Sequence, residues 1–170
     1  SIEGTRGELS DHYDPRSKTL RLSQGVGQGR SVASLAVMAH EIGHAIQDAQ
    51  GYAPMKLRTG LVPAVTVSSW LGPILFIVGI LFQSAGLAWA GVIAFSAGAL
   101  FALVTLPVEL NASQRGLRLL TTYNLVDQRE LGGAKSMLNA AALTYVAALA
   151  QTLSTLLYYI FLLTGMSRRD

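Results

Sequence analysis

Long uncharged stretches alternate with short polar ones along this chain of 170 residues. Residues 59–108 and 136–167 contain no Lys, Arg, Asp or Glu, whereas residues 1–58 carry many charged side chains. A soluble domain of this size does not contain uncharged stretches of this length. Stretches of about 18 or more apolar residues are typical of membrane-spanning helices. The pattern therefore predicts a polar amino-terminal segment followed by a membrane-embedded remainder.

The first uncharged run predicts two membrane helices joined by a tight polar turn. As a helix, residues 61–83 would be about 35 Å long, which exceeds the roughly 30 Å of a bilayer's hydrocarbon core. After the turn, residues 87–108 form a second span, which we expect to end at Pro107 and Glu109. The second uncharged run predicts a third span at residues 139–163.

The polar amino-terminal segment has a different pattern, with short periods and turn residues. Residues 8–14 and 18–23 flank a turn sequence, and residues 19–22 alternate polar with apolar side chains, which predicts a short β-hairpin. Residues 24–30 are rich in glycine and are expected to form a loop. Ser31 is a suitable N-cap for a helix over residues 32–50.

The composition of the chain excludes several classes of protein and several kinds of functional site. Only 14% of the residues are charged, against about 25% in an average soluble domain, and the 51% of hydrophobic residues excludes a disordered chain. The chain has no cysteine, which excludes a disulfide scaffold, a thiol nucleophile and thiolate metal sites. The net charge of +3 is scattered and predicts no nucleic-acid partner. Histidine and carboxylate side chains must therefore hold any metal.

The sequence His40-Glu41-Ile42-Gly43-His44 lies within the predicted helix. Residues four apart share one face of a helix, so both imidazoles can bind a single Zn²⁺ while Glu41 reaches the water on that metal. The alternative is two ordinary helix histidines. That alternative explains neither the glutamate beside His40 nor the use of two of the chain's three histidines. We therefore assign His40 and His44 as metal ligands and Glu41 as the catalytic base.

A catalytic zinc commonly takes three protein ligands, so a third is needed. His12 lies on the expected hairpin, and Asp48 lies one turn beyond His44, where convergence on the same tetrahedral ion would be difficult. Glu109 lies at the boundary of the second span, where a carboxylate is costly without a partner. Glu109 is the preferred third ligand, and His12 is the next candidate.

The positions of the basic residues predict which side of the membrane the polar segments occupy. Six of them flank the spans on one side: Lys56, Arg58, Arg115, Arg118, Arg129 and Lys135. Only Arg168 and Arg169 count for the opposite orientation. By the positive-inside rule, the amino-terminal segment and residues 109–138 should face the cytoplasm.

Several segments together resemble one known family, the YugP-like bacterial membrane zinc metallopeptidases. The resemblance covers nearly the whole chain and is carried by SDHYDPRSKTLRLS at residues 10–23, HEIGHAIQ at residues 40–47, GYAP at residues 51–54 and PVELNAS at residues 107–113. Members of this family resemble longer proteins with an additional amino-terminal membrane helix, so Ser1 is not expected to be the native start.

The stretch beginning at Glu109 also resembles the downstream E-x-x-A-D motif of HtpX-like and CAAX prenyl membrane proteases. In those relatives the glutamate is a zinc ligand, which implies the same role for Glu109. Ser113 stands where they have an aspartate. The resemblance implies that water activated by Zn²⁺ hydrolyses a peptide bond, with Glu41 taking up and returning the proton. The strand at residues 19–23 would offer an edge for an extended substrate, and His12 or Tyr13 could donate to the oxyanion.

We therefore predict a mainly α, multi-pass cell-membrane protein with a zincin-like helix, a short β-hairpin and about three transmembrane helices. Its expected activity is that of a zinc metalloendopeptidase acting on a protein or peptide substrate associated with the bilayer. The alternative is a non-catalytic membrane scaffold or chaperone-like module with a structural metal site. The expected parts are a cytoplasmic-face catalytic segment at residues 1–58, a transmembrane hairpin at 59–110, a polar cytoplasmic helical segment at 111–138 and a carboxy-terminal transmembrane helix at 139–170.

Overall fold

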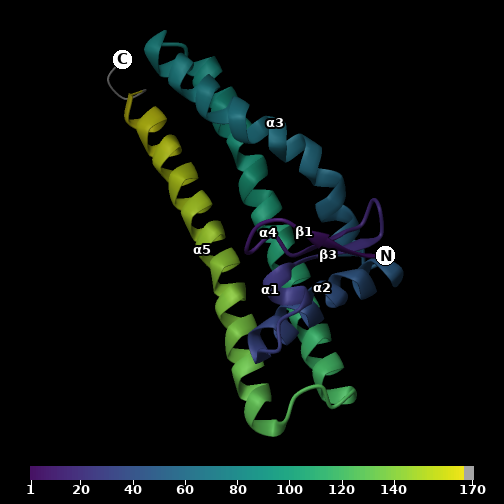
Figure 1. The fold of residues 1–170 in the computed structure, drawn as a ribbon. Helices are drawn as coiled ribbons and strands as arrows, with labels where there is room; N and C mark the ends of the chain where they lie inside the picture. The colour runs from purple at the N-terminus through teal and green to yellow at the C-terminus, as the bar shows by residue number, and fades with distance from the viewer. Residues whose placement is uncertain (167–170) are drawn as a thin grey trace. The chain divides into compact units, whose positions relative to one another are not determined.

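The chain is mainly helical, with one small sheet near its amino terminus. A computed structural model describes residues 1–166, so Arg168 and Arg169 lie outside the described residues (Figure 1). Its elements, in chain order, are β1 (Ile2–Thr5), β2 (His12–Asp14), β3 (Thr19–Ser23), α1 (Gln24–Gly27), α2 (Val32–Ala49), α3 (Ala53–Leu81), α4 (Ala85–Thr122) and α5 (Gln128–Met166). The predicted fold class is confirmed.

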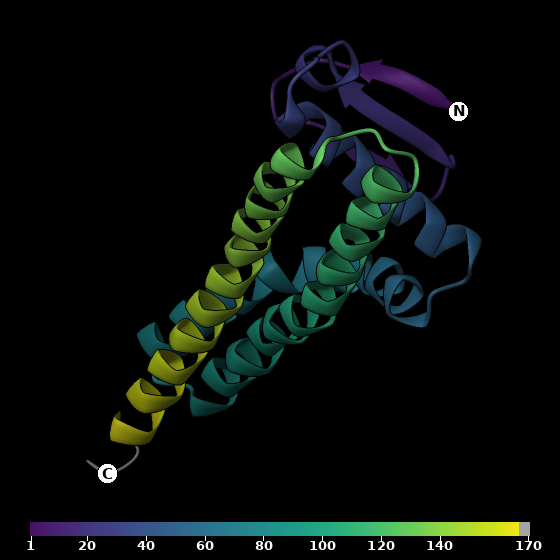
Figure 2. The ribbon, with the colours of Figure 1, turned by 90° about the horizontal axis from the view of Figure 1, so that it is seen from below.

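The three strands form a mixed sheet in the order β1-β3-β2 (Figure 2). Strands β2 and β3 are antiparallel and form the predicted hairpin, while β1 pairs with β3 in parallel and was not predicted. Strand β3 is therefore central. The expectation that residues 19–23 offer a free edge is wrong, because both edges of β3 are already paired.

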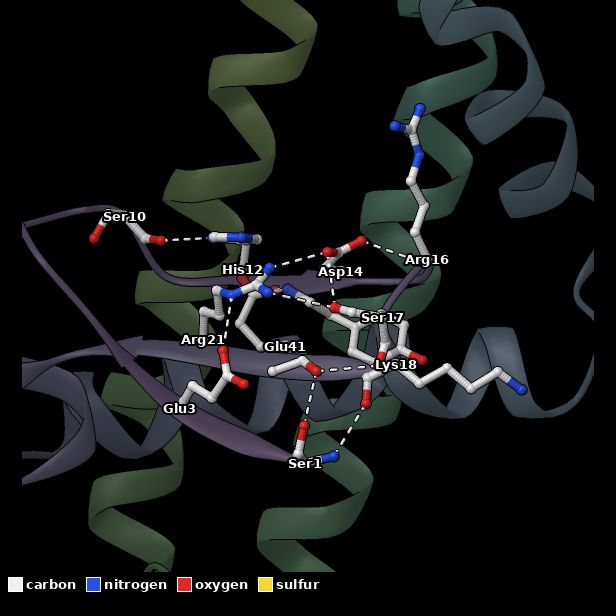
Figure 3. A network of polar contacts seen from close by, with 12 residues as sticks. Ser1, Glu3, Ser10, His12, Asp14, Arg16, Ser17, Lys18, Arg21 and Glu41 are labelled. Carbon is white, nitrogen blue, oxygen red and sulfur yellow. Dashed lines mark hydrogen bonds and ion pairs between the residues drawn. The ribbon is translucent and has the colours of Figure 1, made fainter.

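The sheet has one apolar and one polar face. Leu20 and Leu22 of β3 are buried, and α2 lies against β2 and β3. On the other face Arg21 contacts Glu3 of β1 at 3.2 Å and Asp14 of β2 at 2.9 Å (Figure 3). Hydrogen bonds from Arg21 and then Ser17 hold the pKa of Asp14 well below its usual range. One guanidinium thus joins all three strands.

Helix α2 begins where the sequence predicts. The Ser31 hydroxyl accepts a hydrogen bond from the Ser34 amide, and the Ser34 side chain caps the Ser31 amide in return. This reciprocal cap satisfies two amides that the first turn would otherwise leave without partners. The glycine-rich stretch before it differs from the expected loop. There α1 forms one turn, and the Asp11 carboxylate accepts hydrogen bonds from the amide and hydroxyl of Ser23, the residue just before this turn.

The chain divides into two compact units. The first, called here the polar unit, comprises residues 1–56 and 107–144, and the second, called the apolar unit, comprises residues 57–106 and the chain from 145 onward. Each has a core of its own. In the polar unit, α2 packs against α4 and α5 through Ala36, Ala39, Leu120, Ala134 and Leu138.

Two glycines allow α2 and α4 to approach at backbone distance within the polar unit. A Cβ atom placed on Gly43 would lie 2.4 Å from the carbonyl oxygen of Ala112, and one placed on Gly116 would lie 2.9 Å from the backbone of Ala39. Either contact is too short for a side chain to exist there. Glycine within a helix costs about 1 kcal/mol in helix propensity. The close approach of the two backbones explains why glycine stands at both positions despite that cost.

The apolar unit is built from long helices whose surfaces are largely apolar and exposed. Its core contains Phe76, Ala88, Val92 and Leu163, and Gly72, Gly79 and Gly91 bring α3 and α4 into close contact. In the part of the chain that the structure describes, three helices are long and apolar enough to cross a membrane, and only 6–17% of each one's most apolar 18-residue window is buried. Exposed apolar surface on this scale fits contact with lipid.

The helices are longer than the predicted spans. Helix α4 continues through Pro107 to Thr122, so the helix itself does not end at Pro107 and Glu109, where the second span is predicted to end. Proline removes a single backbone donor, and long membrane helices tolerate that loss. Helix α4 ends just before Asn124, whose positive φ of 50° stops the helix. The third predicted span lies inside α5, which begins earlier, at Gln128.

Candidate metal centre

Three predicted residues meet in the polar unit. His40 Nε2 lies 3.1 Å and His44 Nε2 lies 3.4 Å from the same carboxylate oxygen, Oε2 of Glu109. The ligand-type atoms of the three side chains all lie within 4.8 Å of one another. The histidines come from α2 and the carboxylate from α4, so the site is formed where the two helices pack.

The local sequence explains how each side chain reaches this point. His40 and His44 are four residues apart and therefore share a face of α2. Their rings lie nearly perpendicular, at 87°, with centroids 4.8 Å apart, and the Nε2 atom of each faces Glu109 Oε2. The close approach at Gly43 and Gly116 draws α4 near enough for the carboxylate to reach both rings.

The outer nitrogen of each imidazole has its own partner. His44 Nδ1 lies 3.0 Å from Gln47 Oε1, and His40 Nδ1 lies 3.0 Å from Ser113 Oγ. Because the amide oxygen of Gln47 can only accept, His44 carries its proton on Nδ1. The Nε2 lone pair is then available to a metal ion, as is usual when the other nitrogen of a ligating histidine is held by a hydrogen bond.

Gln47 is fully buried and uses both ends of its amide. Its Nε2 donates to the carbonyl of Val108 at 2.8 Å and to Asn111 Oδ1 at 3.0 Å, which fixes Oε1 toward His44. Arg115 continues the chain of contacts by donating to Asn111 Oδ1 at 2.7 Å. An unsatisfied buried amide would cost about 1–3 kcal/mol, so this network ties α2 to α4 while orienting the imidazole.

Burial changes the pKa values of the ionisable side chains around Glu109. Glu109 is 2% exposed, and both His44 and Glu41 are buried nearby. Burial raises the pKa of Glu41 above its ordinary value, although the two histidines and the Tyr13 amide oppose the shift. Burial lowers the pKa of His44, but the hydrogen bond and negative charge of Glu109 outweigh it, so the net shift is upward. A cation bound among these groups would compete with a proton for His44 Nε2.

The donor set and its spacing suit zinc. Two nitrogens and one carboxylate oxygen form a common ligand combination for catalytic Zn²⁺. Two ligand atoms bound at about 2.0–2.1 Å to one tetrahedral ion lie about 3.3–3.4 Å apart. The separations of 3.1 and 3.4 Å between the imidazole nitrogens and Glu109 Oε2 are close to this value.

The other candidate ligands are engaged elsewhere. His12 is exposed on β2, with Nδ1 2.7 Å from the carbonyl oxygen of Ser10 (Figure 3). Asp48 accepts a hydrogen bond from the Tyr13 hydroxyl at 2.8 Å, so that hydroxyl is already committed as a donor. Neither His12 nor Asp48 belongs to the metal-type cluster among the described residues.

Gln47 and Asn111 are site residues that the sequence analysis did not single out. A spacing signal existed for Gln47, because it is three residues after His44 and seven after His40 and so continues their face of α2. Ser113 is four residues after Glu109 and shares its face of α4 in the same way. Asn111 has no such signal, because its contact with Gln47 depends on how the two helices cross.

The comparisons with known proteins agree with a zinc enzyme of the membrane. The chain belongs to the family described as "Putative neutral zinc metallopeptidase", whose profile matches residues 1–164. Its cofactor is accordingly Zn²⁺.

Among curated proteins, the chain is similar to the "Putative membrane protease YugP" of Bacillus subtilis (strain 168). The two are 42% identical over 161 residues, which covers 95% of this chain and 72% of the relative. No solved structure gives a significant match. The predicted membership in a YugP-like family is confirmed.

We expect Gln47→Ala to weaken zinc binding by about 10- to 100-fold, because the variant leaves His44 Nδ1 without its acceptor. The measurement is competition for zinc with a chelator of known affinity, using the full chain in detergent. Gln114→Ala is the matched control, since Gln114 is exposed on α4. Equal affinities for Gln47→Ala and the control would show that Gln47 does not support the ligand.

Proposed function

We propose that this chain is a membrane-embedded zinc metallopeptidase in which His40, His44 and Glu109 bind the metal and Glu41 is the general base. The convergence of two imidazole nitrogens on one buried carboxylate oxygen carries this proposal. The chain's family and its similarity to a membrane protease support it. The substrate class is a protein or peptide associated with the membrane.

When bound, the zinc lowers the pKa of a water molecule toward about 7 and polarises the scissile carbonyl. Glu41 is the neighbour of His40 on α2 but is not part of the three-residue cluster, so its carboxylate is not needed for binding the ion. Its Oε2 accepts a hydrogen bond from the Tyr13 amide at 3.0 Å. The second oxygen can accept a proton from the attacking water and then deliver it to the leaving amine.

The alternative function is a membrane scaffold with a structural metal site. A structural zinc site commonly has four protein ligands, whereas the cluster found among residues 1–166 has three. A scaffold also has no use for a proton acceptor beside its ligands. The three-ligand set and the buried Glu41 therefore favour the enzyme.

We expect Glu41→Gln to lower peptide hydrolysis by at least about 10²-fold, because an amide cannot accept the proton. Bound zinc should stay near one ion per chain, measured by metal analysis of the purified protein. Glu8→Gln, which changes an exposed glutamate, is the control and should retain activity. Undiminished hydrolysis by Glu41→Gln would contradict the general-base role.

Glu109→Ala should release most of the zinc, because two neutral imidazoles alone form an incomplete site. The test compares zinc occupancy after dialysis with that of His12→Ala, the runner-up ligand. We expect His12→Ala to keep its zinc, since His12 is exposed and bonded to Ser10. The reverse result, zinc lost from His12→Ala and kept by Glu109→Ala, would identify His12 instead of Glu109 as the third ligand.

We also propose that the polar unit's amino-terminal segment faces the cytoplasm, because the basic residues flank the spans on that side. The absence of native cysteine allows a direct test with single cysteines and a membrane-impermeant maleimide on intact bacterial cells. Gln83→Cys, in the exposed turn between α3 and α4, should be labelled from outside. Lys18→Cys should be labelled only after permeabilisation, and the opposite pattern would reverse the topology.

A further inference from the structure

Tyr13 connects strand β2 to helix α2 at two separate points. Its backbone amide donates to Glu41 Oε2 at 3.0 Å, and its hydroxyl donates to Asp48 Oδ2 at 2.8 Å. Glu41 and Asp48 are seven residues apart, which is two helical turns or about 10 Å along one face of α2. A single residue of β2 therefore contacts both ends of the α2 segment from Glu41 to Asp48.

The register of the sheet explains why Tyr13 can do this. Tyr13 is paired with Leu20, whose side chain is buried, so the tyrosine lies on the same face as Leu20. Strand β2 is at the edge of the sheet. In an antiparallel pair the backbone amides point alternately toward and away from the partner strand. The Tyr13 amide points away from β3 and toward Glu41.

Within residues 1–166, the hydrogen-bond donor to the Glu41 carboxylate is the Tyr13 amide. Figure 3 shows the Glu41 side chain beside the strand that carries His12 and Asp14. Because a backbone amide has no rotatable side chain, its direction is decided by where the strand lies. Whatever holds β2 against α2 therefore holds the Glu41 carboxylate.

The hydrogen bond from the Tyr13 hydroxyl to Asp48 is suited to holding β2 against α2. Burial, the hydrogen bond to Asp48 and the negative charges of Asp48 and Asp14 raise the pKa of Tyr13 to about 12. The phenol thus stays protonated and donates to Asp48 throughout the neutral range. A hydrogen bond to an ionised acceptor is shorter and stronger than one between neutral groups.

We propose that the Tyr13–Asp48 hydrogen bond is a positioning device for Glu41: it fixes β2 so that the Tyr13 amide holds one carboxylate oxygen and leaves the other for the proton. Tyr13 and Asp48 are positioning residues, because they act through Glu41. The inference rests on the proposed role of Glu41 as general base. It gives a function to two residues that lie outside the metal cluster.

The first test needs no catalytic activity. Hydrogen–deuterium exchange at single-residue resolution should show a protected Tyr13 amide in the full chain, although this amide takes no part in the pairing with β3. Glu41→Ala should remove that protection, which identifies the acceptor. Asp48→Ala should speed exchange at Tyr13 by about tenfold or more and leave the β3 amides unchanged. Unchanged exchange at Tyr13 in Asp48→Ala would overturn the proposal.

The second test separates positioning from structural support. Tyr13→Phe and Asp48→Ala should each lower kcat by about five- to tenfold, with KM and zinc content unchanged and the thermal midpoint lowered by only a few degrees. The double variant should be no worse than either single variant, because both remove the same bond. Asp48→Asn should restore most of kcat, since its amide oxygen still accepts from the phenol. Tyr123→Phe, at an exposed tyrosine, is the control.

Two results would contradict the proposal in the kinetic test. Asp48→Ala and Tyr13→Phe with wild-type kcat would show that the bond does not position Glu41. A fall in kcat accompanied by loss of zinc, or by a fall of the thermal midpoint much larger than the few degrees that one hydrogen bond accounts for, would indicate a structural role instead. A wild-type chain that hydrolyses nothing would contradict the proposed function, and the exchange experiment would then decide the contact between Tyr13 and Glu41 by itself.

Discussion

The buried carboxylate of Glu109 is the constraint on which the polar unit depends. A charge removed from water is costly unless oppositely charged or hydrogen-bonding groups surround it. Here the surrounding groups are two imidazoles from another helix, each with its outer nitrogen already engaged. Satisfying one carboxylate therefore requires the correct rotation of α2, the correct approach of α4 and the correct imidazole orientations together.

This requirement connects features that are far apart in the sequence. The glycines at 43 and 116 let the two helix backbones come close enough for the Glu109 side chain to reach both rings. Gln47 also holds α2 and α4 together, because its amide bridges His44 to the backbone of α4. The sheet contributes at a different point on α2, through Tyr13. Helix α2 is thus held by α4 on one side and by β2 on another.

The parts of this arrangement that follow from local spacing could be predicted from the sequence. His40, Glu41 and His44 follow from the helical period, and the Ser31 cap follows from side-chain chemistry. Glu109 is 69 residues from His40, yet the scarcity of charge near the predicted spans made it conspicuous. The three apolar helices followed from their length and lack of charge, and their continuation beyond the expected ends depends on packing.

Other contacts could not be predicted, for physical reasons. Strand β1 is four residues long and pairs in parallel with β3, the second strand of the hairpin, so no local pattern marks it. The donor to Glu41 is a backbone amide, and an amide is present at nearly every residue. Pro107 ordinarily ends a helix, but here the helix continues beyond it. In each case the tertiary arrangement decides the outcome.

The glycine contacts between α2 and α4 also have a bearing on which ions the site can hold. Ions such as Ca²⁺, which prefer oxygen ligands at about 2.3–2.6 Å and in larger number, need a wider and more flexible cage. Backbones that already touch at Gly43 and Gly116 cannot move closer, and the Gln47 amide resists their separation. At the proposed metal site, two residues without side chains would therefore act as a spacer of fixed width between the two helices.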